Sequence, residues 1–184
     1  MPPDVEIVIG LETHAQLATD TKLFCGCSTR FGAPPNTQTC PVCTGQPGVL
    51  PVLNRKAFEY ALRTALALDC HINRHTVFDR KNYYYPDLPK NYQISQNYAN
   101  LGVNGRIELE VDGQPRTVRI HNVHLEEDAG KLLHPDDVAS AFPELRAEGA
   151  GEMTMVDLTR AGIPLLEIVT EPHTRSVQQA SAYQ

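Results

Sequence analysis

Four cysteines in the first quarter of the chain have the residue type and the spacing of a metal site. Cys25 and Cys27 form a C-x-C pair, Cys40 and Cys43 form a C-x-x-C pair, and twelve residues separate the pairs. Thiolates on two tight turns joined by a short loop can surround one ion, and four thiolates are typical of structural zinc. The alternatives are reduced thiols or disulfides, and an intracellular setting disfavours disulfides. We therefore predict a zinc-binding loop over residues 25–43.

Acids and an imidazole on predicted strands form a second set of candidate metal ligands. Glu12 and His14 are two residues apart, so both side chains point to the same face of a strand. Glu126, Glu127 and Asp128 end an alternating strand, so their carboxylates point to both faces and at least one faces the core. If the two segments meet, their side chains suit a divalent metal. The alternatives are a solvated strand face at Glu12 and His14 and an acidic turn at 126–128.

A third stretch, "FDRKNYYYPDLPKNYQISQ", interleaves Arg80, Lys81 and Lys90 with aromatic rings that include Tyr83. Cations can contact phosphates and rings can stack on bases, so the composition suits a nucleotide or the end of a nucleic acid. The alternative is a loop whose tyrosines pack against the core. No Walker-type glycine loop occurs in the sequence, so any ATP must be held in another way.

Hydrophobic periodicity indicates the elements that position these residues. Residues 5–17 alternate as a strand, with Val5, Ile7 and Ile9 on the apolar face. The best helix begins after Asn54, a suitable N-cap, and runs through "NRKAFEYALRTALAL". Cys70 follows it, has no partner by spacing, and is expected to be a small packed residue.

The second half of the sequence predicts mainly strands. A "DGQP" turn joins two of them, and the full set comprises residues 106–111, 116–126, 152–158 and 164–169. A short helix is predicted within residues 134–145, and another begins near Thr174. Because no stop signal follows the last helix, we expect the chain to be part of a larger protein.

Composition is that of an ordinary globular protein. The chain has 184 residues, 41% of them hydrophobic, which is enough for one sizeable core. The net charge is −6, and the acidic excess lies entirely in residues 101–184. This balance disfavours a dedicated nucleic-acid binder but permits local basic contacts. Because neither a membrane-length apolar run nor a signal-peptide pattern is found, we expect a cytoplasmic protein.

The chain resembles the N-terminal part of the GatB family, the B-type subunits of aspartyl/glutamyl-tRNA(Asn/Gln) amidotransferases. The resemblance extends from about Val8 to the last residue. It depends on the blocks "IGLETHAQL", "KLFCGCSTRFGAPPNTQTCPVCTGQPGVLPVLN", "FDRKNYYYPDLPKNYQISQ", "VHLEEDAGK" and "VDLTRAGIPLLEIVTEP". One departure is visible, because Thr159 stands where the family usually has Asn, whereas Asp157 and Arg160 match.

The resemblance implies an α+β fold, mostly an antiparallel sheet with packed helices, forming a kinase-like cradle related to glutamine synthetase. Residues 1–184 would be the N-terminal part of this catalytic domain. The family uses ATP and Mg²⁺ to phosphorylate the side-chain carboxylate of Glu or Asp on mischarged tRNA, and ammonia then displaces phosphate. Glu12, His14 and Glu127 match the metal-site positions, with Glu126 beside them. Lys81 is the candidate phosphate contact, with Tyr83 and Lys90 nearby.

The resemblance also implies partners. Ammonia would come from the amidase GatA, with GatC bracing the pair, and we expect the isolated chain to be nearly inactive. Two alternatives remain. One is a zinc-stabilised binding or assembly module without catalysis of its own, and the other is a GatE-type relative that amidates only Glu-tRNA.

Overall fold

A curved antiparallel sheet forms the centre of the molecule. The computed structural model describes residues 5–141 and 153–183. Five strands are ordered β1-β9-β6-β5-β2, and every neighbouring pair is antiparallel. Their bounds are β1 Glu12–Gln16, β9 Pro164–Thr170, β6 Gln114–Glu127, β5 Gly102–Val111 and β2 His71–Ile72. The predicted α+β class with a mainly antiparallel sheet is therefore confirmed.

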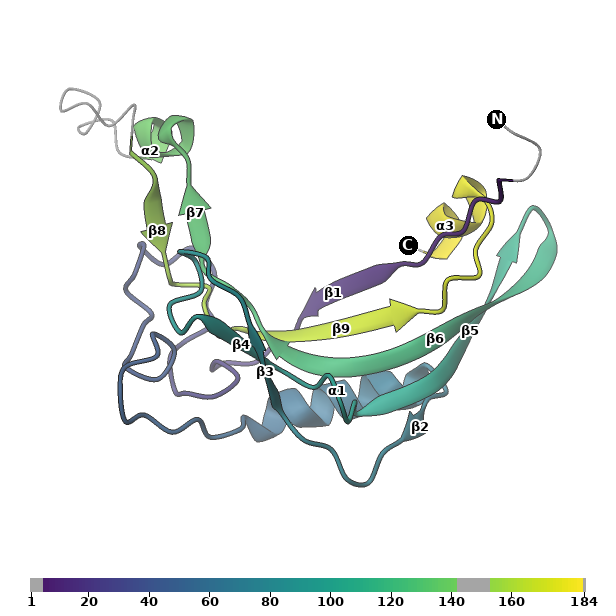
Figure 1. The fold of residues 1–184 in the computed structure, drawn as a ribbon, viewed down its shortest axis with the longest axis horizontal. Coiled ribbons are helices and arrows are strands. Elements are labelled where there is room, and N and C mark those ends of the chain that lie inside the picture. The colour runs from purple at the N-terminus through teal and green to yellow at the C-terminus, as the bar shows by residue number, and fades with distance from the viewer. Residues whose placement is uncertain (1–4, 142–152, 184) are drawn as a thin grey trace.

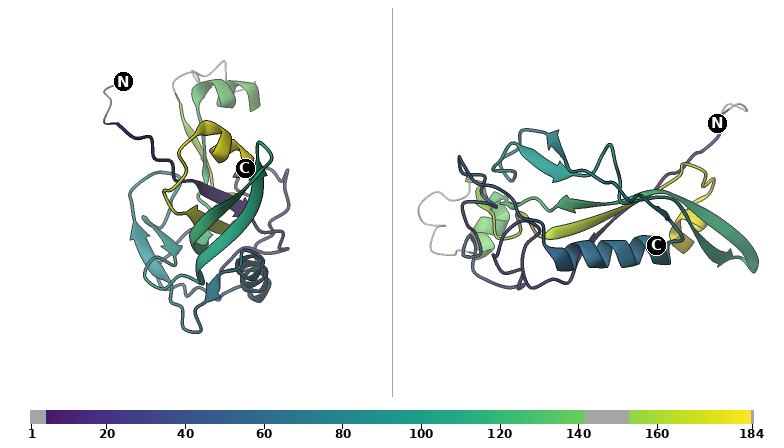
Figure 2. Two further views of the ribbon diagram at one scale, coloured as in Figure 1. Left: turned by 90° about the vertical axis from the view of Figure 1, so that its right-hand side faces the viewer. Right: turned by 90° about the horizontal axis from the view of Figure 1, so that it is seen from below.

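Helix α1, Arg55–Ala67, covers one face of this sheet (Figure 2). The Asn54 side chain caps it by accepting hydrogen bonds from the amides of Lys56 and Ala57 at 2.9 and 3.2 Å, as predicted. Its buried stripe consists of alanines, which let the helix approach the sheet closely. The core between them contains Ala57, Ala61, Ala65, Ile120, Val123, Leu125 and Leu166.

The β5–β6 hairpin is the longest pair of strands. Asp112 and Gly113 form its turn, both with positive φ, which is the conformation that a two-residue hairpin loop requires. Near the other end of β5, a Cβ added at Gly105 would lie 2.4 Å from the Cys70 sulfur. The expected packing of Cys70 is therefore confirmed, and glycine at this position makes room for the thiol.

The basic and aromatic stretch folds as a second ribbon, although the sequence showed no regular period there. Strands β3, Asp79–Asn82, and β4, Tyr92–Ser95, pair with each other. Within the described residues, β5 pairs with β6 only as far as Val123. Beyond Val123, polar side chains in and next to β4 form hydrogen bonds with the β6 backbone. The Leu125 amide donates to Gln96 Oε1 at 3.0 Å, and Gln93 Nε2 donates to the Glu127 carbonyl at 2.7 Å.

Two smaller parts stand at opposite ends of the sheet in Figure 1. At one end, strands β7, Lys131–Leu133, and β8, Met155–Asp157, pair to form an arm that carries α2, Pro135–Ala141. At the other end lies α3, Val177–Tyr183. Strand β8, the start of α2 and helix α3 agree with the predicted strand 152–158, helix 134–145 and helix near Thr174, whereas β7 was not predicted. Residue 152 and residues 142–145 of these predictions lie outside the described residues.

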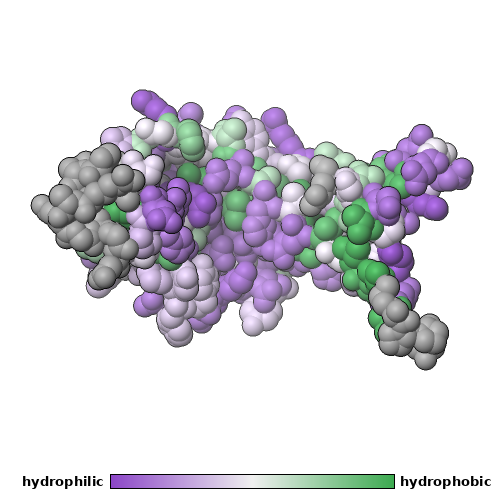
Figure 3. Space-filling model, turned by 90° about the horizontal axis from the view of Figure 1, so that it is seen from above, coloured by the Kyte–Doolittle hydropathy of each residue, from purple (hydrophilic) through white to green (hydrophobic). Residues whose placement is uncertain are grey.

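The N-terminal strand starts later than predicted. Val5 and Ile7 are 59% and 51% exposed instead of buried, and β1 begins only at Glu12. The reason is that, among the described strands, β1 pairs only with β9, and β9 ends at Thr170, which leaves a single bridge at Ile9. Figure 3 shows hydrophobic surface at this end of the molecule. No helix within the described ranges has the length and hydrophobicity of a membrane span.

Candidate functional site

Three neighbouring strands place acids and imidazoles on the sheet face opposite α1. His14 on β1, Glu167 on β9 and His124 on β6 are direct cross-strand partners. Glu12 precedes His14 by two residues and Glu126 follows His124 by two, so both share this face. We call these residues the carboxylate–imidazole row: Glu12, His14, His124, Glu126 and Glu167.

Glu167 links the two halves of the row. His14 Nε2 lies 2.8 Å from Glu12 Oε1 and 3.1 Å from Glu167 Oε2. On the other side, His124 Nε2 lies 3.6 Å from Glu167 Oε1 and 3.4 Å from Glu126 Oε1. Within each half the ligand atoms lie within 4.8 Å of one another, a spacing that could hold a metal ion.

The pKa values of the two buried carboxylates, Glu126 and Glu167, shift in opposite directions. Burial favours the neutral acid at Glu126, but hydrogen bonds from His124 and Ser95 outweigh it and lower the pKa of Glu126 to about 2. Burial and the nearby charge of Glu126 raise the pKa of Glu167. Two buried acids whose pKa values are pushed apart are typical of a site that accepts a proton or a cation.

The two ring nitrogens of His124 face different partners, and Nε2 is the one that faces the acids. His124 Nδ1 lies 2.8 Å from Asn122 Oδ1, and because a carbonyl oxygen only accepts, Nδ1 must carry a hydrogen. A neutral His124 then faces two carboxylates with the lone pair of Nε2. The Nε2 lone pair and the two carboxylates repel one another. Either a proton on Nε2, which supplies the hydrogen bond to Glu126, or a cation between these groups removes this repulsion, so the row is suited to bind a proton or a cation.

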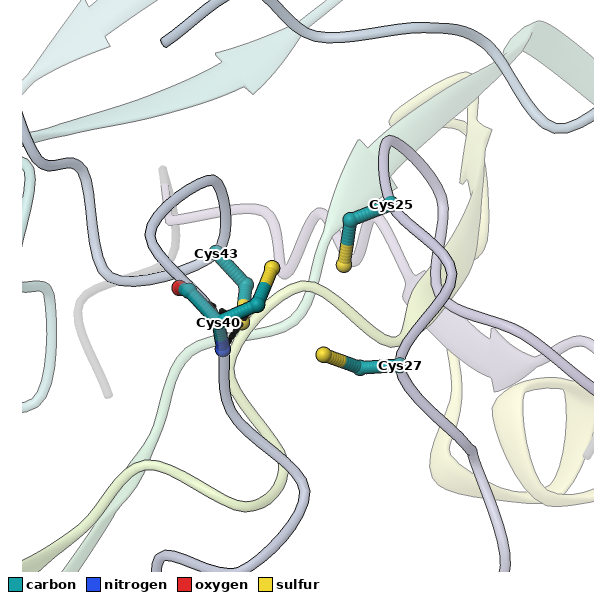
Figure 4. Close-up of side chains that lie close together, drawn as sticks. All are labelled: Cys25, Cys27, Cys40 and Cys43. Carbon is teal, nitrogen blue, oxygen red and sulfur yellow. Dashed lines mark hydrogen bonds between the residues drawn. The ribbon is translucent and has the colours of Figure 1, made fainter.

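The four predicted cysteines also come together. Figure 4 shows their sulfur atoms facing one another, and all lie within 4.8 Å of each other. The Cys40 amide donates to Cys43 Sγ at 3.2 Å. A hydrogen bond from Cys25 lowers the pKa of Cys43 to about 4, whereas the same bond and burial raise the pKa of Cys25. The cluster could therefore hold a metal, and none of the five cysteines, all within the described ranges, forms a disulfide.

Comparison with known proteins identifies the family. The family described as "GatB/GatE catalytic domain" matches residues 7–184. The chain belongs to the GatB/GatE family. Curated proteins named as the B-type subunit of aspartyl/glutamyl-tRNA(Asn/Gln) amidotransferase, from Geobacter sulfurreducens and Brevibacillus brevis, are 57% and 54% identical over 97% of the chain. The chain covers 35% and 34% of these relatives, so it spans about a third of their length.

In this GatB/GatE chain, Glu127 is separated from the row. As the neighbour of Glu126 on β6 it points to the opposite face, where its carboxylate contacts Lys90 and accepts from the Ile94 amide at 3.1 Å. Glu127 was expected beside Glu12 and His14, and the structure instead brings Glu167 to them. Asp128 also lies outside both clusters and accepts from Gln16 at 2.6 Å.

The three candidate nucleotide contacts have different surroundings. Lys81 is 58% exposed and its ammonium lies 3.9 Å from Glu126 Oε1. It lines a cavity of about 320 Å³ together with Tyr98, Glu126 and Glu167. Tyr83 is exposed, at 36%, and the burial of the rest of its side chain raises its pKa. The side chain of Lys90 is only 8% exposed and pairs with Glu127.

Sequence reasoning missed His124 and Glu167. Both lie within stretches that were predicted as strands, so the elements were known but these side chains were not singled out. His124 could have been found by alternation, because it precedes Glu126 by two residues. Glu167 could have been found as the one acid inside the apolar run "PLLEIV".

Proposed function

We propose that this chain forms the N-terminal part of the catalytic cradle of a tRNA-dependent amidotransferase subunit. The substrates would be ATP and tRNA mischarged with Glu or Asp. The observation that carries the proposal is the carboxylate–imidazole row, whose side chains could hold the cation that phosphoryl transfer between two anions needs. The names of the relatives support the same reaction class.

The residues of the row fit Mg²⁺, and each would have its own role as a ligand. Mg²⁺, when bound, would neutralise phosphate charge and align ATP with the attacking carboxylate. Glu12 and Glu126 would contribute oxygen ligands, and Glu167 would contribute the carboxylate shared by both halves, with Oε2 toward His14 and Oε1 toward His124. Glu127 lies on the other face and would act indirectly, by holding Lys90 and β4 against β6.

The cavity beside the row suits the phosphates. Lys81 lies at its wall with a side chain that is 58% exposed and an ammonium 3.9 Å from Glu126, so the ammonium can contact a phosphate oxygen in the cavity while it stays near that carboxylate. Tyr83 would flank the nucleotide. Lys90 would be a structural cation, because its ammonium already contacts Glu127 and lies 5.5 Å from the Tyr92 ring centre.

We further propose that Cys25, Cys27, Cys40 and Cys43 bind zinc. The four converging sulfur atoms and the hydrogen bond that the Cys40 amide donates to Cys43 Sγ suit a closed structural site. In the assembled enzyme, an amidase partner of the GatA type would supply ammonia, with a GatC-type protein stabilising the pair.

The proposal is tested by comparing Glu167→Gln with Glu171→Gln in the full-length protein assembled with its partners. Glu171 follows β9, pairs with His121 at 2.8 Å and lies outside the row, so it is a matched control. We expect Glu167→Gln to weaken Mn²⁺ binding and tRNA-dependent ATP cleavage by about 10- to 100-fold, and Glu171→Gln to leave both unchanged. A protein that never binds Mn²⁺ would instead be a zinc-stabilised binding module.

A further inference from the structure

The turn of residues 158–163 joins the thiol loop, residues 25–43, to the strand that carries Glu167. Its Gly162 carbonyl accepts from the Leu23 amide at 2.9 Å, just before the thiol loop. On its other side the Gly162 amide donates to the Asp128 carbonyl at 2.8 Å, and the Asp128 amide donates to the Ile163 carbonyl at 2.9 Å. β9 starts at the next residue, Pro164, so this turn sets where β9 begins against β6.

Asn36, in the thiol loop, grips this turn with its side chain and its backbone. Asn36 Nδ2 donates to the Val156 carbonyl at 3.0 Å, and Asn36 Oδ1 accepts from the Leu158 amide at 2.8 Å. The Asn36 amide donates to Thr159 Oγ1 at 2.7 Å. Asn36 has φ +60°, a conformation that Asn tolerates better than most residues. One residue thus contacts Val156 in β8 and the first two residues of the turn, Leu158 and Thr159, from more than a hundred residues away in sequence.

Lys22 connects the same turn to the thiols. Its side chain is fully buried, which is costly for an ammonium that lacks partners. The ammonium donates to the Gln38 carbonyl at 2.7 Å and to the Leu158 carbonyl at 3.5 Å, and it lies 3.7 Å from Cys43 Sγ. The charge therefore ties the thiol loop, its sulfur cluster and the turn together.

We infer that Asn36, assisted by Lys22, is a positioning residue that couples the thiol loop to the carboxylate–imidazole row. By fixing the turn it holds the start of β9, and Glu167 lies three residues along that strand at 7% exposure. Since Glu167 touches both imidazoles, a small displacement of β9 opens both halves of the metal site. This inference rests on the proposed role of the row in metal binding.

The test replaces Asn36 without straining the backbone. Asn36→Gly removes both side-chain hydrogen bonds while glycine keeps access to positive φ. Asn104→Gly is the matched control, because Asn104 also has positive φ, at +54°, but is exposed on β5 away from the turn. A second variant, Thr159→Val, removes the hydroxyl that accepts from the Asn36 amide.

Two readouts in the full-length zinc-loaded protein decide the matter: the Mn²⁺ dissociation constant and amide hydrogen exchange at residues 158–167. We expect Asn36→Gly to raise both by about tenfold, with Thr159→Val smaller and Asn104→Gly unchanged. Faster exchange with unchanged Mn²⁺ affinity, or unchanged exchange, overturns the coupling while leaving the metal site intact. Absence of Mn²⁺ binding in the unaltered protein overturns the proposed function, and the coupling with it.

Discussion

The thiol loop and the carboxylate–imidazole row are both clusters of side chains that could hold a metal ion, but they are assembled differently. The four cysteines lie within nineteen consecutive residues, so local turns bring them together. The row draws its members from β1, β6 and β9, whose order in the sheet is unrelated to their order in the chain. The loop therefore depends on short-range geometry, whereas the row depends on the pairing of three strands. Substitutions should separate the two dependences.

The largest effect is expected in the thiol loop. Cys40→Ser should abolish binding of one zinc per chain and remove much of the roughly 10 kcal/mol or more that a structural zinc site contributes. Cys70→Ala is the control, because Cys70 is buried but lies outside the cluster. Zinc content by mass spectrometry and the thermal midpoint are the measurements. Equal zinc content in Cys40→Ser and the unaltered protein would contradict the assignment.

The next largest effect is expected from two acids, Glu12 and Glu127, that the sequence analysis assigned to the same metal site. Glu127→Ala leaves Lys90 buried without its partner and should cost about 3–5 kcal/mol in the free energy of unfolding. Glu12→Ala should change that free energy little, because the Glu12 side chain is 55% exposed, yet it should weaken Mn²⁺ binding. Urea unfolding and metal titration separate the two effects. Equal destabilisation by both variants would contradict a structural role for Glu127 and a metal-binding role for Glu12.

A smaller effect is expected at the cavity wall. Lys81→Met removes an ammonium that can contact phosphate, worth about 1.5 kcal/mol for a hydrogen bond to a charged group, or roughly a tenfold rise in KM for ATP. Lys56→Met is the control, since Lys56 is exposed on α1. Steady-state kinetics of the assembled enzyme provide the comparison. An unchanged KM would exclude Lys81 as the phosphate contact.

The smallest effect concerns pH. Burial opposes ionisation of Asp157, but hydrogen bonds from Thr159 and Asn36 outweigh burial and lower its pKa. A lowered folded-state pKa adds stability above the unfolded value of about 4 and loses it as pH falls below that value. Asp157→Asn should therefore reduce the difference in urea midpoint between pH 7 and pH 3. An unaltered difference would show that these contacts do not stabilise the turn.

The same distinction decides how much could be predicted from sequence. Helix α1 and the β5–β6 hairpin follow from local signals, the Asn54 cap and the Asp112–Gly113 turn. The thiol cluster follows from cysteine spacing. The late start of β1 could not be predicted, because it depends on where β9 ends, more than 150 residues away in sequence.

The candidate row was predicted only in part for the same reason. Alternation shows that Glu12 and His14 share a face, but the partner facing them depends on which strand lies beside β1. That strand is β9, so Glu167 occupies the position for which Glu127 was the expected residue. Adjacent residues on β6 point to opposite faces, and only the sheet order determines that Glu126 belongs with the row.

The proposed metal site requires that side chains from three strands hold one divalent ion. Crystals of the full-length protein soaked with Mn²⁺ and an ATP analogue, measured for anomalous scattering, would locate that ion. We predict a peak within about 2.5 Å of oxygen atoms of Glu167 and of Glu12 or Glu126. A peak beside Glu127 and Lys90 instead, or no peak at the row, would contradict a metal site at the row.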